Sequence, residues 1–303
     1  MKFELTILGC SSATPTSHRY PSAQILNVSE RFFLIDCGEG AQMQLRKFKF
    51  KMQRINHVFI SHLHGDHYFG LMGLLSSMHL LGRKTKLHLY AHSELKNIID
   101  IQLKSSDTRF NYELIFHPLQ YEKSEVILDD NHLTVETILL NHRIPCCGFL
   151  FKEKPREKSL IKSKITEYNI PVPAISEIKK GAGFITGDGK IIPNSELTLE
   201  LSSPRSYAYC SDTRYDERLL EQVKEVDLLY HEATFMHNMQ ERAKETFHTT
   251  ALEAGTLALK ANVKQLVIGH YSARYKDLEP LLNEAQSIFP NTLLGEEGKT
   301  YII

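Results

Sequence analysis

The sequence contains no long hydrophobic run. Within its 303 residues no apolar stretch approaches the roughly 20 residues that a transmembrane helix requires. The opening residues, MKFELTILGC, contain the acidic Glu4 and an apolar run too short for a signal peptide. Hydrophobic residues nevertheless make up 42% of the chain and charged residues 24%, which is ordinary for a protein with a substantial buried core. We therefore expect a cytoplasmic protein that has no membrane anchor and is not disordered.

Cysteine and net charge are also scarce. The five cysteines are odd in number and show no C-x-x-C spacing, a pattern typical of reduced thiols in a reducing compartment. Lysine plus arginine and aspartate plus glutamate number 36 each, so the formal charges balance. Any binding of a polyanion must therefore depend on local patches of basic residues.

The chain has two similar halves, each a series of short apolar runs that end in polar turns. The first half predicts strands at residues 3–9, 23–28, 31–36, 57–61, 86–91 and 133–142, and a helix at 70–82. The second half predicts strands at 206–212, 226–233, 265–272 and 300–303, and helices at 215–225, 249–261 and 276–289. Strands with helices between them predict two stacked sheets with helices on the outside.

Residues 151–200, between the halves, differ in composition. From Lys152 to Lys180 there are eight basic residues against four glutamates. Proline and glycine interrupt the segment in NIPVPAIS and KKGAGFITGDGK. We interpret 151–200 as an inserted, partly extended arm within a single domain that spans residues 1–303. A solvated linker is the alternative interpretation.

The stretch FISHLHGDHYFG, at residues 59–70, concentrates side chains that can bind metal. Within six positions it contains His62, His64, Asp66 and His67. A single histidine is more often structural, but this density after an apolar run predicts a metal site. His62 and His64 would project to one side of an extended chain, and Gly65 would permit a turn that directs the next two ligands back. Four ligands on so short a loop cannot surround one ion well, so we expect two ions with ligands borrowed from elsewhere.

Three other apolar runs end in a residue that can bind metal. They are LLNH, YCSD and VIGH, which end in His142, Asp212 and His270. A strand end gives a loop-borne site a rigid support, so the repeated arrangement is informative. Each residue is weak evidence alone, but together with the cluster they form a coherent ligand set.

The residues HLHGDH at 62–67 resemble the HxHxDH motif of the metallo-β-lactamase superfamily. The runs DCGEGAQ, SDTR, HEATF, FHTTALEAG and GHYSARY, in that order, more specifically resemble the ribonuclease Z family of tRNA 3′-processing endonucleases, also called zinc phosphodiesterases. The resemblance implies an α/β protein with the metallo-β-lactamase fold, a four-layer αββα sandwich with an inserted exosite arm. In that family the arm binds tRNA away from the active site.

The resemblance also implies two Zn²⁺ ions per chain. One ion would be held by His62, His64 and His142, and the other by Asp66, His67 and His270, with Asp212 bridging them. This set of nitrogen and oxygen ligands suits zinc and tolerates manganese.

Two catalytic residues follow from the same resemblance. Asp66 would be the proton acceptor, and His248 would contact the scissile phosphate or protonate the leaving oxygen. His248 alternatively is only a polar residue at the start of a helix. Four further residues are candidates to orient the metal-binding side chains through hydrogen bonds: Asp36, Glu39, His231 and Glu232. The other histidines, at positions 18, 57, 79, 88, 92, 117, 132 and 237, lack such contexts, and we expect structural or surface roles for them.

Several features favour a nucleic acid as substrate. RKFKFKMQR, at residues 46–54, combines five basic residues with Phe48 and Phe50, which could stack on bases. An amphipathic connector between a helix and a strand is the alternative interpretation. Arg274, in HYSARY, could pair with a phosphate oxygen.

These features together predict a zinc-dependent endoribonuclease that removes the 3′ trailer from precursor tRNA. Attack by a metal-bound hydroxide would leave a 3′-hydroxyl on the tRNA and a 5′-phosphate on the trailer. The family also implies a homodimer in which the arm of one subunit presents substrate to the other. Two alternatives stay open: a small-molecule phosphodiesterase or other dinuclear-zinc metallohydrolase, and a tRNA-binding protein without catalysis.

Overall fold

The computed structural model describes residues 2–200 and 203–303. The chain divides into two compact units. The larger unit contains the residues up to Asp129, Thr134–Phe151 and Arg205–Ile303, and the smaller contains Asp130–Leu133 and Lys152–Pro204. None of the helices in the described part of the chain combines the length and apolar character that a membrane crossing requires.

The first sheet of the larger unit has seven strands in the order β16-β1-β2-β3-β4-β5-β6. They are β1 (Phe3–Gly9), β2 (Ala23–Val28), β3 (Arg31–Cys37), β4 (Ile55–Phe59), β5 (Leu87–Ala91), β6 (Leu114–Pro118) and β16 (Thr300–Ile302). The strands from β16 to β3 pair antiparallel, whereas those from β3 to β6 pair parallel. The carboxyl ends of β3 to β6 therefore lie at one edge of the sheet.

The second sheet of the larger unit has the order β15-β14-β13-β12-β9-β8-β7. Its strands are β7 (Val126–Asp129), β8 (Leu133–Leu139), β9 (Cys147–Glu153), β12 (Ser206–Cys210), β13 (Leu228–Glu232), β14 (Gln265–Gly269) and β15 (Thr292–Leu294). The strands from β12 to β15 pair parallel, so their carboxyl ends also share one edge.

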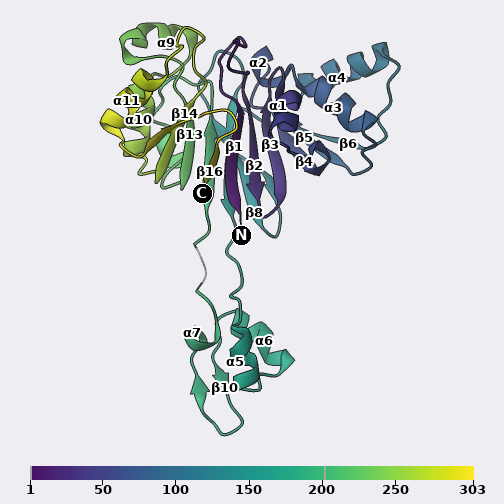
Figure 1. Ribbon diagram of the computed structural model, residues 1–303, viewed down its shortest axis with the longest axis vertical. Coiled ribbons are helices and arrows are strands. Elements are labelled where there is room, and N and C mark those ends of the chain that lie inside the picture. The colour runs from purple at the N-terminus through teal and green to yellow at the C-terminus, as the bar shows by residue number, and fades with distance from the viewer. Residues whose placement is uncertain (1, 201–202) are drawn as a thin grey trace. The chain divides into compact units, whose positions relative to one another are not determined.

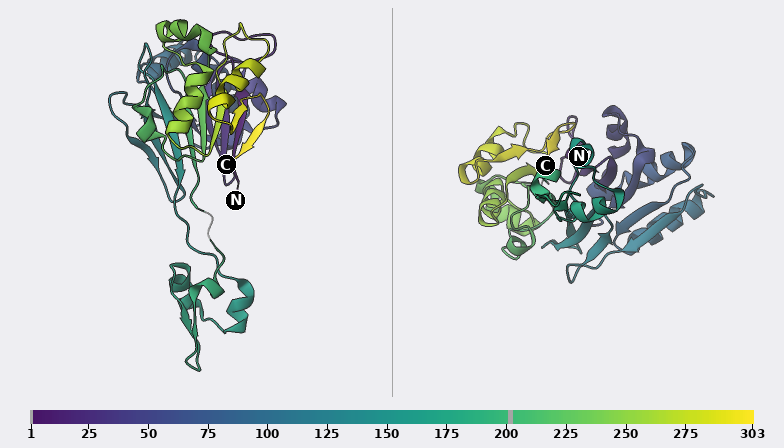
Figure 2. Two further views of the ribbon diagram at one scale, coloured as in Figure 1. Left: turned by 90° about the vertical axis from the view of Figure 1, so that its left-hand side faces the viewer. Right: turned by 90° about the horizontal axis from the view of Figure 1, so that it is seen from below.

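Helices cover the outer faces of both sheets (Figures 1 and 2). On the side of the first sheet they are α1 (Ala41–Lys47), α2 (Gly65–Tyr68), α3 (Leu71–Leu80) and α4 (Glu94–Ser105), with the short turn η1 (Met52–Arg54). After β12 come α8 (Leu219–Gln222), η2 (His237–Met239), α9 (Gln240–Thr246), α10 (Ala251–Lys260) and α11 (Glu279–Ile288). The predicted arrangement of two stacked sheets with outer helices is confirmed.

The sheets pack against each other through aromatic side chains. Phe59 of β4 lies with its ring centroid 5.3 Å from that of Phe149 and 5.5 Å from that of Phe151, both on β9. The neighbouring Val58 faces the other way, into the cluster formed with the helices. Successive residues of one strand therefore supply two different cores.

Some predicted elements are shorter than the sequence suggested. The helix expected at 215–225 is limited to α8, because the Asp216 side chain accepts a hydrogen bond from Arg218 N at 2.9 Å and forms a turn before it. The strands expected at 57–61 and 133–142 end at Phe59 and Leu139.

The smaller unit has elements and a core of its own. It contains α5 (Lys162–Glu167), α6 (Val172–Lys179), β10 (Phe184–Ile185), β11 (Ile191–Ile192) and α7 (Asn194–Leu197). Its buried apolar cluster consists of Ile170, Ile178, Ile192 and Leu197. The segment between the two sheet-forming halves is therefore folded rather than extended throughout.

Candidate metal centre

The HLHGDH stretch lies beyond the carboxyl end of β4. The strand ends at Phe59, so His62 and His64 are on a loop and not on an extension of the strand. Their side chains nevertheless meet, with His62 Nε2 3.0 Å from His64 Nδ1. Gly65 begins α2, and a Cβ atom there would lie 2.2 Å from the ring of Phe69, an exposed side chain that would have to turn away. The loop and the first turn of α2 thus carry four possible ligands.

The three distant ligand candidates also follow strands. His142 comes after β8, Asp212 after β12 and His270 after β14. Asp212 and His270 have φ angles of 50° and 57°, in the left-handed region that non-glycine residues rarely adopt. Such backbone strain, of order 1–3 kcal/mol per residue, persists where the surrounding structure enforces it, often at active sites.

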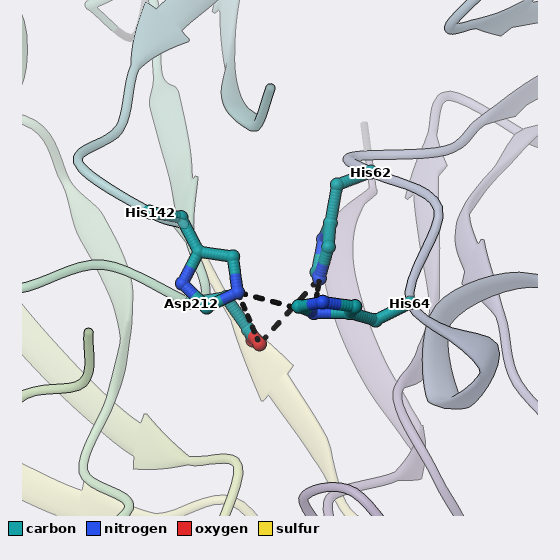
Figure 3. Close-up of side chains that lie close together, drawn as sticks. All are labelled: His62, His64, His142 and Asp212. Carbon is teal, nitrogen blue, oxygen red and sulfur yellow. Dashed lines mark hydrogen bonds and ion pairs between the residues drawn. The ribbon is translucent and has the colours of Figure 1, made fainter. Parts of the chain in front are cut away.

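A first group of ligand atoms comes from His62, His64, His142 and Asp212 (Figure 3). His64 Nδ1 lies 3.0 Å from His62 Nε2 and 3.1 Å from His142 Nε2. Asp212 Oδ2 lies 3.6 Å from His62 Nε2 and 3.8 Å from His142 Nε2. Loops of both sheets therefore contribute to this group.

A second group comes from Asp66, His67, Asp212 and His270. His67 Nε2 lies 3.4 Å from Asp66 Oδ2 and 3.2 Å from Asp212 Oδ1. His270 Nε2 lies 3.4 Å from Asp66 Oδ2 and 3.0 Å from Asp212 Oδ1. Asp212 thus directs one carboxylate oxygen to each group, as a bridging ligand requires.

The spacing of these atoms fits tetrahedral coordination. Ligand atoms about 2.0–2.1 Å from a tetrahedral zinc ion stand about 3.3–3.4 Å from one another. The separations given above for four pairs of atoms in each group, 3.0–3.4 Å in the second group and 3.0–3.8 Å in the first, lie around this value, and all ligand atoms of a group are within 4.8 Å of one another. His67 Nε2 is buried and has no hydrogen-bond partner among the described residues. Each group could therefore hold a metal ion.

Asp36, near the end of β3, orients His67. Its Oδ2 atom accepts a hydrogen bond from His67 Nδ1 at 2.7 Å and another from the Tyr209 hydroxyl at 2.6 Å. The Ser61 hydroxyl donates to the same oxygen at 2.9 Å and lies 3.0 Å from His62 Nδ1. One buried carboxylate therefore fixes a ligand of the second group and is linked through Ser61 to the first.

His67 of the second group differs in its protonation from the three histidines of the first. Burial lowers the pKa of His62 well below its usual value and also lowers the pKa values of His64 and His142. Burial opposes the charged form of His67 too, but the surrounding carboxylates, led by Asp212, raise its pKa well above its usual value. The first group therefore offers neutral nitrogens, whereas a cation in the second would replace the proton of His67.

His248 lies on the turn before α10, beside both groups. Its Nδ1 nitrogen donates a hydrogen bond to Glu232 Oε1 at 2.8 Å. Glu232 is buried at the end of β13 and also accepts hydrogen bonds from the backbone N–H groups of Thr213 and Thr249, at 2.8 and 3.1 Å. Burial opposes a charge on His248, but Glu232 outweighs it and raises the pKa of His248 to about 9. Without a bound cation His248 is thus an imidazolium with its Nε2 proton available.

A cavity of about 520 Å³ opens over these residues. Besides ligand residues and His248, two arginines line it, Arg143 and Arg242. No sequence motif predicts a role for either arginine, and the only local signal is that Arg143 directly follows a ligand candidate. Arg274 is not among the described residues that line this cavity, and its guanidinium lies over the ring of Phe235 at 5.0 Å. Its contact with a phosphate stays a prediction.

The other supporting candidates differ in position. Glu39 is exposed on the turn that precedes α1. His231 is buried, with Nδ1 2.8 Å from the carbonyl oxygen of Glu232, and belongs to neither ligand group. Only Asp36 and Glu232, of the four candidates, hydrogen-bond to a ligand or catalytic candidate through their carboxylates within the described residues.

The basic stretch at 46–54 has a structural role. Phe48 and Phe50 are partly buried and pack against the cluster between the first sheet and its helices. Phe50 also meets Phe32 edge to face, with ring centroids 5.8 Å apart. The rings are therefore engaged in the core, which favours the connector interpretation over base stacking.

Comparison with known proteins decides the family. Over 296 residues the sequence is 54% identical to a ribonuclease Z of Phocaeicola vulgatus, covering 98% of this chain and 96% of that protein. The chain belongs to the ribonuclease Z family. Another ribonuclease Z, from Bacteroides thetaiotaomicron, is 51% identical over 98% of this chain and 94% of its own length. The predicted family is confirmed.

Solved structures agree with this membership. Human tRNase Z, short form, superposes with a TM-score of 0.71 at 26% identity, covering 98% of both chains. The metallo-β-lactamase fold protein YhfI of Bacillus subtilis has a TM-score of 0.70 at 17% identity and covers all of both chains, which shows the fold alone. A family model described as "Anti-Pycsar protein Apyc1" matches residues 3–106, a segment that ends before the second sheet begins. The predicted metallo-β-lactamase fold is confirmed.

Proposed function

We infer that the protein is a tRNA 3′-processing endoribonuclease. The observation that carries this conclusion is the pair of ligand groups that share Asp212, in a chain 54% identical to a ribonuclease Z over nearly its whole length. Human tRNase Z, with a similar structure, supports the same activity. The protein thus cleaves a phosphodiester of precursor tRNA and depends on bound metal.

We propose two zinc ions per chain, one in each group. The first would be held by His62, His64 and His142 and the second by Asp66, His67 and His270, with Asp212 shared. Two zinc ions at these positions would supply a hydroxide at neutral pH and offset the negative charge of the phosphate. The ligands are nitrogen and oxygen atoms at tetrahedral spacing, which supports zinc.

We propose that Asp66 and His248 handle the protons of the reaction. Asp66 Oδ2 accepts a hydrogen bond from the N–H of Ala13 at 2.8 Å, and Asp66 lines the cavity over the ligand groups, where its carboxylate can accept a proton from the attacking water. His248, charged and held by Glu232, can donate its Nε2 proton to the leaving 3′-oxygen of the tRNA. The products would be a 3′-hydroxyl on the tRNA and a 5′-phosphate on the trailer.

We also propose that the smaller unit, which contains most of residues 151–200, binds the body of the tRNA. Its surface carries exposed lysines such as Lys162 and Lys190, which can contact phosphates. A cytoplasmic homodimer, in which this unit of one subunit presents the tRNA to the other, is the arrangement we propose by analogy with the family. Sedimentation with and without tRNA measures the subunit number.

The decisive experiment maps the cut site on a precursor tRNA. We expect cleavage at the 3′ side of the acceptor stem, loss of cleavage after chelation, and recovery on adding zinc. Asp66→Asn should abolish cleavage, whereas Glu39→Gln, an exposed carboxylate nearby in sequence, should retain it. Cleavage of bis(p-nitrophenyl) phosphate without cleavage of precursor tRNA would instead support a small-molecule phosphodiesterase.

A further inference from the structure

A second cavity, of about 580 Å³, adjoins the metal centre. His142 and Arg143 line both this cavity and the one over the ligands. Its other walls come from the carboxyl ends of β5 and β6 and from the loops that follow β6 and β8. Its volume lies within the range of about 300–1,000 Å³ that is usual for sites of organic ligands. Apart from the shared His142, none of the roles proposed above uses it.

Tyr121 and His92 form an aromatic wall of this second cavity. Their ring centroids lie 5.5 Å apart and their planes are inclined by 37°. Tyr121 as a whole is only partly buried, but its hydroxyl is fully buried, so the ring rather than the hydroxyl is what this side chain offers to the cavity. His92 Nδ1 accepts a hydrogen bond from Glu94 N at 3.3 Å, which leaves Nε2 for a ligand. Two flat rings and one ring nitrogen without a partner, His92 Nε2, suit a nucleobase, which has a face to stack and an edge to hydrogen-bond.

Arg143 supplies positive charge where the two cavities meet. Its side chain is exposed, and no ion pair joins it to an acidic residue among those described. Glu122 lines the second cavity further along, and its negative charge repels phosphate. A phosphate would therefore lie at Arg143, while the Glu122 carboxylate can accept hydrogen bonds from ribose hydroxyls or base amino groups.

We propose that the second cavity binds the first unpaired nucleotides of the 3′ trailer. This rests on the proposed function, in which His248 protonates the leaving oxygen of the tRNA and so marks the tRNA side of the scissile phosphate. His248 lines only the first cavity. The trailer must leave the phosphate in another direction, and the second cavity begins at His142 with a phosphate-binding arginine followed by stacking rings.

The test compares two precursors that differ only in trailer length, one nucleotide against five. For the unaltered protein we expect a lower KM with the longer trailer. Tyr121→Ala and Arg143→Ala should each bring the ratio of the two KM values close to one, which for Tyr121→Ala is a change of roughly ten-fold through the lost stacking contact. Arg109→Ala, an exposed arginine that lines neither cavity, should leave the ratio unchanged.

The ratio separates the possible outcomes. A variant that raises both KM values equally, or neither, would overturn the trailer site even though the protein still processes tRNA. Failure of the unaltered protein to cut either precursor would instead reject the proposed function. If Tyr121→Ala does not fold, Arg143→Ala decides alone, because its side chain is exposed and its removal leaves the core intact.

Discussion

Two buried carboxylates each hold one histidine by its Nδ1 nitrogen. Asp36 holds His67 at 2.7 Å, and Glu232 holds His248 at 2.8 Å. Each bond directs the Nε2 nitrogen of its histidine towards the ligand groups and raises the basicity of the ring. At His67 this favours binding of a cation, and at His248 it favours retention of a proton. The same pairing of residues thus serves two different chemical roles.

We expect Tyr209→Phe to weaken metal binding about ten-fold, because supporting contacts of this kind typically contribute 10- to 100-fold to affinity. The substitution removes the hydroxyl that donates to Asp36 at 2.6 Å and leaves the buried ring in place. Competition with a coloured chelator measures the affinity. Tyr207→Phe is the matched control, since this buried tyrosine of the same strand donates to Gln24 instead. Equal affinities for both variants would contradict the prediction.

We expect Glu232→Gln to shift the alkaline limb of the pH–rate profile to lower pH. Glu232 raises the pKa of His248 to about 9, so its proton is present at neutral pH and is lost as the pH rises through the pKa. Removing the carboxylate charge lowers that pKa. Bound cations lower the pKa of His248 in the unaltered protein and in the variant alike. The pKa therefore remains lower in the variant. Single-turnover cleavage across pH measures it, with Glu39→Gln as control; an unmoved limb would argue against His248 as proton donor.

At the scale of elements, the site depends on how the turn after β3 packs against α2 and α3. A Cβ atom at Gly38 would lie 2.4 Å from the backbone oxygen of Asp66, and one at Gly70 would lie 2.1 Å from the backbone oxygen of Gly38. These glycines bring the backbone that carries Asp66 and His67 into direct contact with the first sheet. The ligand positions on α2 are therefore set by close contact between main chains.

We expect Gly38→Ala to destabilise the protein by about 1–3 kcal/mol, the usual effect of overpacking, and to weaken metal binding. The added methyl group meets backbone, which cannot move without displacing Asp66. Gly65→Ala is the matched comparison, because its methyl group meets the ring of Phe69, which is 65% exposed and can turn away. Urea unfolding of both metal-free variants gives the free energies. If both variants lose the same free energy of unfolding, the close contact between the main chains at Gly38 and Asp66 is not the cause of the destabilisation.

Much of this site is visible in the sequence, because ligand motifs at strand ends are local patterns. HLHGDH and the residues after three other apolar runs pointed to the seven residues that the fold brings together. The hydrogen bond from the Tyr209 hydroxyl to Asp36 joins residues 173 positions apart. No sequence pattern around either residue predicts this contact. The second cavity likewise needs three separate loops to form. Contacts that form only through tertiary packing therefore cannot be predicted from local sequence patterns.

At the scale of the whole larger unit, the two candidate ligand groups draw on both sheets. The first group combines His62 and His64 from the first sheet with His142 and Asp212 from the second. The second group likewise draws on α2 and on the loops after β12 and β14. Metal ions bound there would add a connection to layers that also meet through ring contacts such as that of Phe59 with Phe149 and hydrogen bonds such as that from Tyr209 to Asp36.

We expect removal of metal to lower the thermal midpoint, and zinc to restore it. Metal at 100 times its dissociation constant stabilises the folded state by about 2.7 kcal/mol, since only the folded chain assembles the ligands. Differential scanning calorimetry of chelated and zinc-loaded protein measures the shift. Asp212→Asn, which loses the charge shared by both groups, should show a smaller shift. Identical midpoints with and without zinc would mean that the ligands do not join the sheets.

The order of synthesis adds a consequence of the pairing between β1 and β16. Residues 4–6 pair with residues 25–27 of β2 on one side but with residues 300–302 on the other, so the first sheet lacks its edge strand β16 until the ribosome has made almost the whole chain. The second ligand group is likewise incomplete until His270 has been synthesised. Contacts so distant in sequence form slowly. Metal loading should therefore follow translation, and a nascent chain arrested before residue 270 should not retain the second ion.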